Sequence, residues 1–203
     1  MDLSIDILQE WGACSDGRYW FITQEETNHI KLVEKLIKQD KIFWAHWLIS
    51  RTLGFIGGIK YVVYVAKTVL YLYESEYPKD FRLHKIVELA EGVTYPDILN
   101  AIKESLNAIA KPLFDLTCSI TNIAFMDKNY AASGVAQVVS CVCRALMDNE
   151  YRIWCIYREA LYSVDALVSY MGDIKERDTH KKQHLKRYIQ YGLELLKEEA
   201  NAK

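Results

Sequence analysis

The sequence predicts an all-α protein, a single-domain multi-helix bundle of about eight to ten helices. Apolar residues recur at every third or fourth position along most of the chain, which is the period of a helix with one buried face. Only 3 prolines and 9 glycines interrupt this pattern in 203 residues. A chain of this length with 51% hydrophobic residues can bury one sizeable core.

We expect one domain over residues 1–203. Within it, an N-terminal segment of short helices, residues 1–58, is expected to pack on a core bundle formed by residues 59–203. The first expected helix runs from Ile5 to Trp11, after a capping serine at position 4. Gly12 stands where a helix end often needs a residue that tolerates positive φ.

The stretch GACSDGRYWF, residues 12–21, puts a thiol, a hydroxyl and a carboxylate next to two glycines. Because no histidine lies close in sequence to complete a nucleophile, we interpret it as a corner between helices rather than a reaction centre. Ser15 or Asp16 is expected to cap the segment that follows, and Trp20 and Phe21 to hold the corner against the bundle.

Capping signals and breaks place the remaining helices. Thr23 and Glu26 have the spacing of a capping box, which would open a helix from Gln24 to about Gln39. Pro112 is expected to break or kink a helix, because proline removes a donor and crowds the carbonyl four residues back. The other expected helices cover 42–53, 59–77, 81–91 capped by Asp80, 98–126 on both sides of Pro112, 130–146, 151–171 and 179–199.

The longest apolar stretch, residues 61–73, is too short for a membrane span and predicts a buried core helix. It has 13 residues with Lys67 at its centre, whereas a spanning helix needs roughly 20. The first residues are acidic where a secretory signal needs basic residues before an apolar run. Five cysteines, an odd number, fit a reducing compartment. We therefore expect a cytoplasmic protein that does not use a membrane.

The charge balance disfavours a general attraction to nucleic acid. Lys and Arg number 25 against 27 acidic residues, which gives a formal net charge of -2. One basic cluster near the C-terminus keeps nucleic-acid binding open as an alternative; it comprises Lys175, Arg177, Lys181, Lys182, Lys186 and Arg187.

No pattern in the sequence predicts a catalytic residue, a bound metal or a cofactor. Cys141 and Cys143 would point about 200° apart on a helix, so they cannot readily hold one zinc ion. His180 and His184 share a helix face, but four cations surround them and would oppose a dication. A nucleophile elbow and a glycine-rich phosphate loop are both missing from the sequence. We therefore expect a protein that is not an enzyme.

The segment from Glu74 to Arg82 is the first candidate interaction surface. A helix end, a proline stop and an aspartate cap account for its charges, but an arginine held by carboxylates also presents a fixed fork of donors to a partner. Tyrosine, with 14 copies, is a residue type that often dominates interfaces. The predicted partner-binding residues are Glu74, Tyr77, Asp80, Arg82, Lys181 and Lys182.

The same region resembles a helical family of immunity proteins related to the fifth class of polymorphic-toxin immunity proteins. That family has a helix ending in VL-x-(L/I)-(F/Y)-E, a P-x-D-x-R-P turn and a helix starting A-I-E-A-A. Here Leu83 replaces the second proline and Val87 intervenes in the last motif, and the likeness spans about residues 60 to 170. The matching residues are Val69, Leu70, Tyr73, Glu74, Pro78, Asp80, Arg82, Ile86, Glu88 and Ala90.

The N-terminal segment resembles uncharacterised phage and prophage proteins with an ACxxG motif followed by an aromatic pair. Ala13, Cys14, Gly17 and the aromatic residues from Tyr19 to Phe21 carry this likeness. The two resemblances imply a non-enzymatic protein of phage or bacterial conflict systems, which binds and neutralises a toxin, defence or host protein. A second copy of the chain is a further candidate partner. The alternatives are a nucleic-acid-associated phage protein and a metal-dependent helical-bundle enzyme.

Overall fold

The computed structural model describes residues 1–94, 106–147 and 177–202, and their regular elements are all helices. The only strand-like pairing among these residues is a single bridge between Asp2 and Asn28. The all-α prediction is therefore confirmed. The nine described helices are α1 (Ile5–Glu10), α2 (Ser15–Ile22), α3 (His29–Lys38), α4 (Ile42–Thr52), α5 (Phe55–Glu76), α6 (Arg82–Val93), α8 (Leu106–Met126), α9 (Tyr130–Met147) and α11 (Arg177–Asn201).

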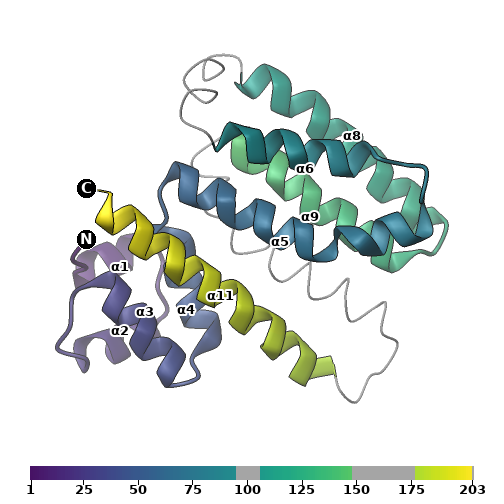
Figure 1. Cartoon of the computed structure of the whole chain (residues 1–203). Helices are drawn as coiled ribbons and strands as arrows, with labels where there is room; N and C mark the ends of the chain where they lie inside the picture. Colours follow the sequence, from purple (N-terminus) through teal and green to yellow (C-terminus); the bar gives the residue numbers. More distant parts are fainter. Residues whose placement is uncertain (95–105, 148–176, 203) are drawn as a thin grey trace.

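Two groups of helices share one core (Figure 1). The first group is α1 to α4; the second is α5, α6, α8 and α9, in which α9 packs against the other three. The C-terminal helix α11 contacts α3 and α4 of the first group and α5 of the second. One continuous set of buried residues, from Leu3 to Leu196, therefore includes both groups.

Helices α5 and α9 form the centre of the second group. Val65 and Ala66 of α5 and Ala132 and Ala136 of α9 have no exposed surface, and such small side chains allow two helices to approach closely. The expectation of a buried helix over residues 61–73 is confirmed, although both α5 and α9 are long and apolar enough to cross a membrane. In the most apolar 18-residue window of each helix, 61% of the window in α5 and 67% of that in α9 is buried inside the protein.

The corner at GACSDGRYWF is shorter than expected, because most of this stretch belongs to α2. Gly12 does adopt positive φ, at 78°, and ends α1 as predicted. The cap of α2 is Cys14 rather than Ser15 or Asp16: its Sγ accepts a hydrogen bond from the backbone N–H of Gly17 at 3.4 Å. Gly17 therefore lies within the helix and does not turn the chain, while Trp20 and Phe21 pack against the core as expected.

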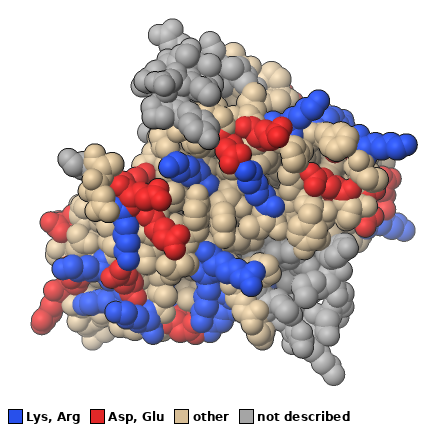
Figure 2. Space-filling model, viewed as in Figure 1, with Lys and Arg blue, Asp and Glu red and all other residues tan. Residues whose placement is uncertain are grey.

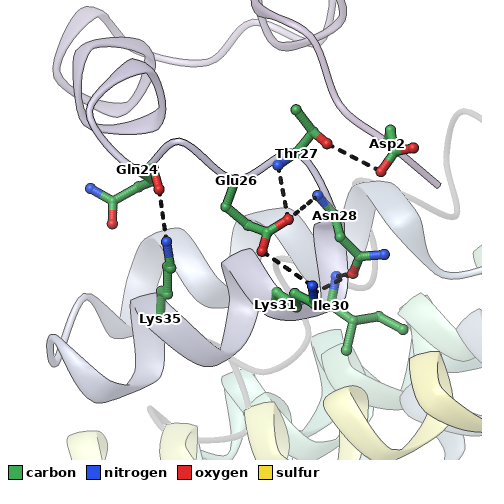
Figure 3. Close-up of polar contacts among 8 residues, drawn as sticks. All are labelled: Asp2, Gln24, Glu26, Thr27, Asn28, Ile30, Lys31 and Lys35. Atoms are coloured by element: carbon green, nitrogen blue, oxygen red, sulfur yellow. Dashed lines mark hydrogen bonds and ion pairs between the residues drawn. The ribbon is translucent and has the colours of Figure 1, made fainter.

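The predicted capping box at Thr23 was wrong, and α3 starts five residues later than expected. Glu25 has a positive φ of 50°, which interrupts any helix from Gln24. The carboxylate of Glu26 accepts from the backbone N–H groups of Thr27 and Asn28, both at 3.0 Å, and Asn28 Oδ1 caps α3 by accepting from Ile30 (Figure 3). An asparagine cap supported by a neighbouring glutamate thus replaces the threonine cap.

Helix α5 begins at Phe55, four residues before the expected start at residue 59, and it includes Gly57 and Gly58. The N-cap residue Gly54 has no side chain, and the carboxylate of Glu199 on α11 accepts its backbone N–H with oxygens at 3.1 and 3.0 Å. A Cβ at Gly57 would lie 2.3 Å from Glu199 Oε1, so the glycine makes room for this cap. The division of the chain at residues 58 and 59 consequently falls inside α5.

Pro112 is expected to break or kink a helix, and the break does not occur. Helix α8 runs from Leu106 to Met126 with Pro112 in its interior. The packing of α8 along α9 outweighs the loss of one backbone donor. The expected helices over 130–146 and 179–199 are confirmed as α9 and α11. The first part of the helix expected over 98–126, residues 98–105, and the whole helix expected over 151–171 lie outside the described residues.

Candidate functional site

The turn between α5 and α6 and the turn between α8 and α9 lie side by side at one end of the bundle, on the right in Figure 1. The hydroxyl of Tyr77 donates to Asp127 Oδ2 at 3.5 Å, which joins the two turns across 50 residues of sequence. We call this region the Arg82 corner; it comprises residues 73–84 and 120–130.

Arg82 is held at the centre of the corner by Asp80. Its Nε lies 2.8 Å from Asp80 Oδ1 and its Nη2 lies 2.6 Å from Asp80 Oδ2, a two-point geometry that fixes the guanidinium plane. The hydroxyl of Tyr73, a buried residue of α5, donates to Asp80 Oδ2 at 2.6 Å. Asp80 Oδ1 also accepts from the backbone N–H of Arg82, the first residue of α6, at 3.1 Å. The N-cap residue of α6 is nevertheless Phe81 and not the predicted Asp80, and no side chain bonds in the N-cap position.

The protonation states of this cluster follow from its geometry. Hydrogen bonding to Arg82, followed by the bond from Tyr73, holds the pKa of Asp80 well below its usual range. Burial and then the hydrogen bond to Asp80 raise the pKa of Tyr73. The hydrogen bond to Asp80 raises the pKa of Arg82. At neutral pH the cluster is therefore a fixed ion pair with a neutral tyrosine, not a proton donor and acceptor set.

A second charged cluster lies beside the first on α5 and α6. His84 Nδ1 is 2.8 Å from Glu74 Oε1, and its Nε2 is 3.3 Å from Glu88 Oε1. The hydrogen bond to Glu74 is the main cause that raises the pKa of His84, and the charge of Glu88 adds to it. Glu74 therefore lies in the Arg82 corner, where its partner is His84 and not Arg82.

Exposed apolar side chains gather at the same corner. Ile123 lines a small cleft of about 160 Å³ together with Tyr77, Asp80 and Arg82. Met126, the last residue of α8, is 81% exposed. Phe125 and Tyr130, both more than half exposed, form an edge-to-face pair with ring centroids 5.7 Å apart. An apolar surface of this kind around a fixed arginine is typical of a protein-binding site.

The structure places Lys181 and Lys182 on α11, apart from the Arg82 corner in sequence and in the fold. Lys182 pairs with Asp40, and Lys186 Nζ lies 3.1 Å from the other oxygen of the same carboxylate. Two cations of the basic cluster thus neutralise an acidic residue of the protein itself. On the face of the molecule drawn in Figure 2, acidic and basic side chains are interspersed and do not form one continuous basic surface.

The described residues contain no group of three or more His, Cys, Asp or Glu side chains that could hold a metal ion. Cys141 and Cys143 are both buried in α9, as expected for core cysteines. The side chain of His180 lies outside the described residues.

The sequence analysis missed His84 and the residues that the end of α8, the turn after it and the start of α9 bring to the corner, namely Ile123, Phe125, Met126, Asp127 and Tyr130. His84 stands ten residues after Glu74, and this pairing depends on the turn between two helices. Asp127 and Ile123 come from the hairpin of α8 and α9. No local pattern in the sequence shows that this hairpin lies beside the α5–α6 turn. Tyr73 appeared in the sequence only as a matched position of the family motif, and its hydrogen bond to Asp80 was not foreseen.

Comparison of the chain with family models, with curated proteins and with solved structures finds no match. The immunity-protein and phage resemblances therefore stay predictions.

Proposed function

We propose that this protein is a non-enzymatic interaction protein that binds and neutralises a protein partner through the Arg82 corner. The observation that carries this proposal is the fixed Arg82–Asp80 pair beside exposed apolar side chains. Arginine and aromatic side chains are the groups that most often dominate protein interfaces. An arginine already oriented by an internal carboxylate loses little conformational entropy when a partner binds.

The corner favours a partner of definite chemistry. The cleft next to Arg82 is lined mainly by the apolar atoms of Tyr73, Ile120, Ile123 and Ala124, so it fits one apolar side chain. About half of the Arg82 side chain, 49%, stays exposed and can donate to a carboxylate or carbonyl oxygen. We therefore infer a protein surface that presents an apolar residue next to a hydrogen-bond acceptor.

The class of partner comes from the resemblances and not from the corner itself. An immunity-like protein or an inhibitor from a phage or bacterial conflict system acts by covering its target, which requires a surface and no catalytic group. A toxin, a defence protein or a host protein would each serve as such a target. The mixture of charges on the visible face fits recognition of one protein better than attraction to nucleic acid.

Affinity capture from the source cell, with variants of the bait, tests the proposal. The unmodified chain should recover one partner at constant stoichiometry. Arg82→Glu and Ile123→Asp should each weaken that complex at least tenfold, because the first reverses the charge and the second places a carboxylate in the apolar cleft. Neutralisation is then tested by expressing the recovered partner with and without this protein and measuring cell growth.

A matched control uses the same changes far from the corner. Arg187→Glu on α11 and Ile22→Asp at the end of α2 also alter exposed residues, but on other elements. They should leave the complex intact. Equal binding by the corner variants and the control variants, with all of them folded by circular dichroism, would remove the Arg82 corner from the interface.

A further inference from the structure

A cavity of about 330 Å³ opens among α1, α2, α3 and α4, on the side of the molecule away from the Arg82 corner. Its floor consists of leucines that are at most 5% exposed, namely Leu3, Leu8, Leu32, Leu36 and Leu48. Its walls carry the rings of Trp20, Phe21, Trp44 and Trp47, and Cys14 and Gly17 also line it. The size and the apolar lining are those of a small-molecule site.

The ACxxG motif and the aromatic pair that follows it form one wall of this cavity. Ala13, Cys14, Gly17, Trp20 and Phe21 all line it, and their spacing places them on a single face of the segment that contains α2. The absence of a side chain at Gly17 leaves space in this wall: a Cβ there would meet only Cys14 Sγ, at 3.4 Å. The motif therefore shapes a cavity and does not supply a reaction centre.

The lining selects an uncharged ligand. Lys, Arg, His, Asp and Glu are all missing from the cavity lining in the described part of the chain. Two of its polar side-chain atoms are already engaged: Trp20 Nε1 donates to Gln39 Oε1 at 2.7 Å, and Cys14 Sγ accepts from Gly17. The accessible lining is mostly apolar, which does not favour ordered water. A charged ligand would lose its hydration without compensation.

The walls are held in place before any ligand binds. The rings of Trp20 and Trp44 meet edge to face, with centroids 6.3 Å apart. Lys41 Nζ lies 4.4 Å from the centre of the Trp44 ring, and the Arg51 guanidinium lies 5.7 Å from that of Trp47. Fixed indole rings favour a flat aromatic ligand, because they can contact its face and its edge at once.

We propose that this cavity binds an uncharged aromatic molecule of about two fused rings. A cavity of roughly 150 Å³ lined by aliphatic and aromatic side chains accommodates benzene, so a volume about twice as large fits a bicyclic ring system. The site differs from the Arg82 corner in position and chemistry, and it does not depend on the function proposed for that corner.

The experiment is a titration of the full-length protein with N-phenyl-1-naphthylamine, an uncharged naphthalene whose emission rises in apolar surroundings. Excitation of tryptophan should sensitise the probe, because three tryptophans line the cavity. We expect saturable binding with a Kd below about 100 μM, and competition by indole. Absence of saturable binding up to that concentration would overturn the proposal.

Variants locate the bound probe. Gly17→Leu fills the cavity from the α2 wall and Leu48→Trp fills it from the floor, and each should weaken binding at least tenfold. Gly92→Leu is the matched control for the first, since a Cβ at Gly92 on α6 meets nothing within 4 Å and the residue does not line the cavity. Cys14→Ser should keep most of the affinity, because the thiol is part of the wall and does not react.

Two further results would contradict the proposal. Equal affinity of Gly17→Leu, Leu48→Trp and Gly92→Leu, with all three folded by circular dichroism, would place the probe elsewhere on the protein. A dimer in gel filtration that dissociates as the probe binds would assign the cavity to a side chain of a second copy.

Discussion

Asp80 and Arg82 form a two-point ion pair within a single turn, and Tyr73 from the preceding helix donates to the same carboxylate. The pair fixes the direction of the α5–α6 turn and orients the arginine. The carboxylate is buried more deeply than the guanidinium, with 19% and 49% of their side chains exposed. The ion pair should therefore make a measurable contribution to the free energy of unfolding, unlike an ordinary surface pair.

Asp80→Asn should lower the free energy of unfolding at neutral pH by about 1 kcal/mol, allowing for screening at the half-exposed arginine. Because the pKa of Asp80 is depressed in the folded protein, its contribution is complete above the unfolded value of about 3.9 and is lost as the pH falls through the folded value. The unmodified protein should thus lose more stability than the variant as the pH drops below about 4. Urea unfolding at a series of pH values measures this difference.

The control for this experiment is Asp115→Asn, which alters an exposed aspartate on α8. This variant should show the same dependence of the free energy of unfolding on pH as the unmodified protein. If Asp80→Asn gave the same acid profile as this control, the ion pair would make no net contribution to folding.

His84 should titrate above its ordinary pKa, because the folded protein holds it between Glu74 and Glu88. A raised pKa means that its stabilising contribution is present below the unfolded value of about 6.5 and is lost as the pH rises through the folded value. Glu74→Gln should lower the pKa of His84 more than Glu88→Gln does, since Glu74 makes the shorter contact. Nuclear magnetic resonance titration of the histidine ring protons measures both shifts, and a pKa of 6.5 or lower in the unmodified protein would contradict the geometry.

Gly192→Ala should destabilise the protein by about 1–3 kcal/mol through overpacking. A Cβ at this position on α11 would lie 2.8 Å from Ile49 Cγ2 of α4 and 3.1 Å from Tyr61 Cε2 of α5. Gly92→Ala is the matched change in open space on α6, where the gain in helix propensity should stabilise by up to about 1 kcal/mol. The midpoint temperature of thermal unfolding should fall for Gly192→Ala and rise for Gly92→Ala. A shift of the same sign for both would mean that α11 does not pack this closely on α4 and α5.

The protein should bind DNA weakly, because Lys182 and Lys186 are already paired with Asp40. Asp40→Asn should increase retention on DNA at low salt by releasing both lysines. Asparagine also tolerates the positive φ of 57° at this position, so the fold should be kept. Fluorescence anisotropy with labelled DNA over a range of salt concentrations measures the effect. Tight binding by the unmodified protein, with a steep dependence on salt, would instead support the nucleic-acid alternative.

Local signals in the sequence determined the all-α class, the cap at Ser4, the turn at Gly12 and most helix bodies, because hydrophobic periodicity and single capping groups act within one or two turns. The same local reasoning also brought Tyr77, Asp80 and Arg82 into one candidate site, since they lie within six residues of one another.

Tertiary structure decided the features that depend on distant partners. Helix α5 begins at Phe55 because Glu199 caps it from the other end of the chain, and α8 continues through Pro112 because α9 packs along it. Asp127 and Ile123 complete the Arg82 corner only after two helical hairpins are placed together. The cavity behind the ACxxG motif needs walls from four helices. Each of these arises from contacts between residues far apart in sequence, which no local pattern of residues specifies.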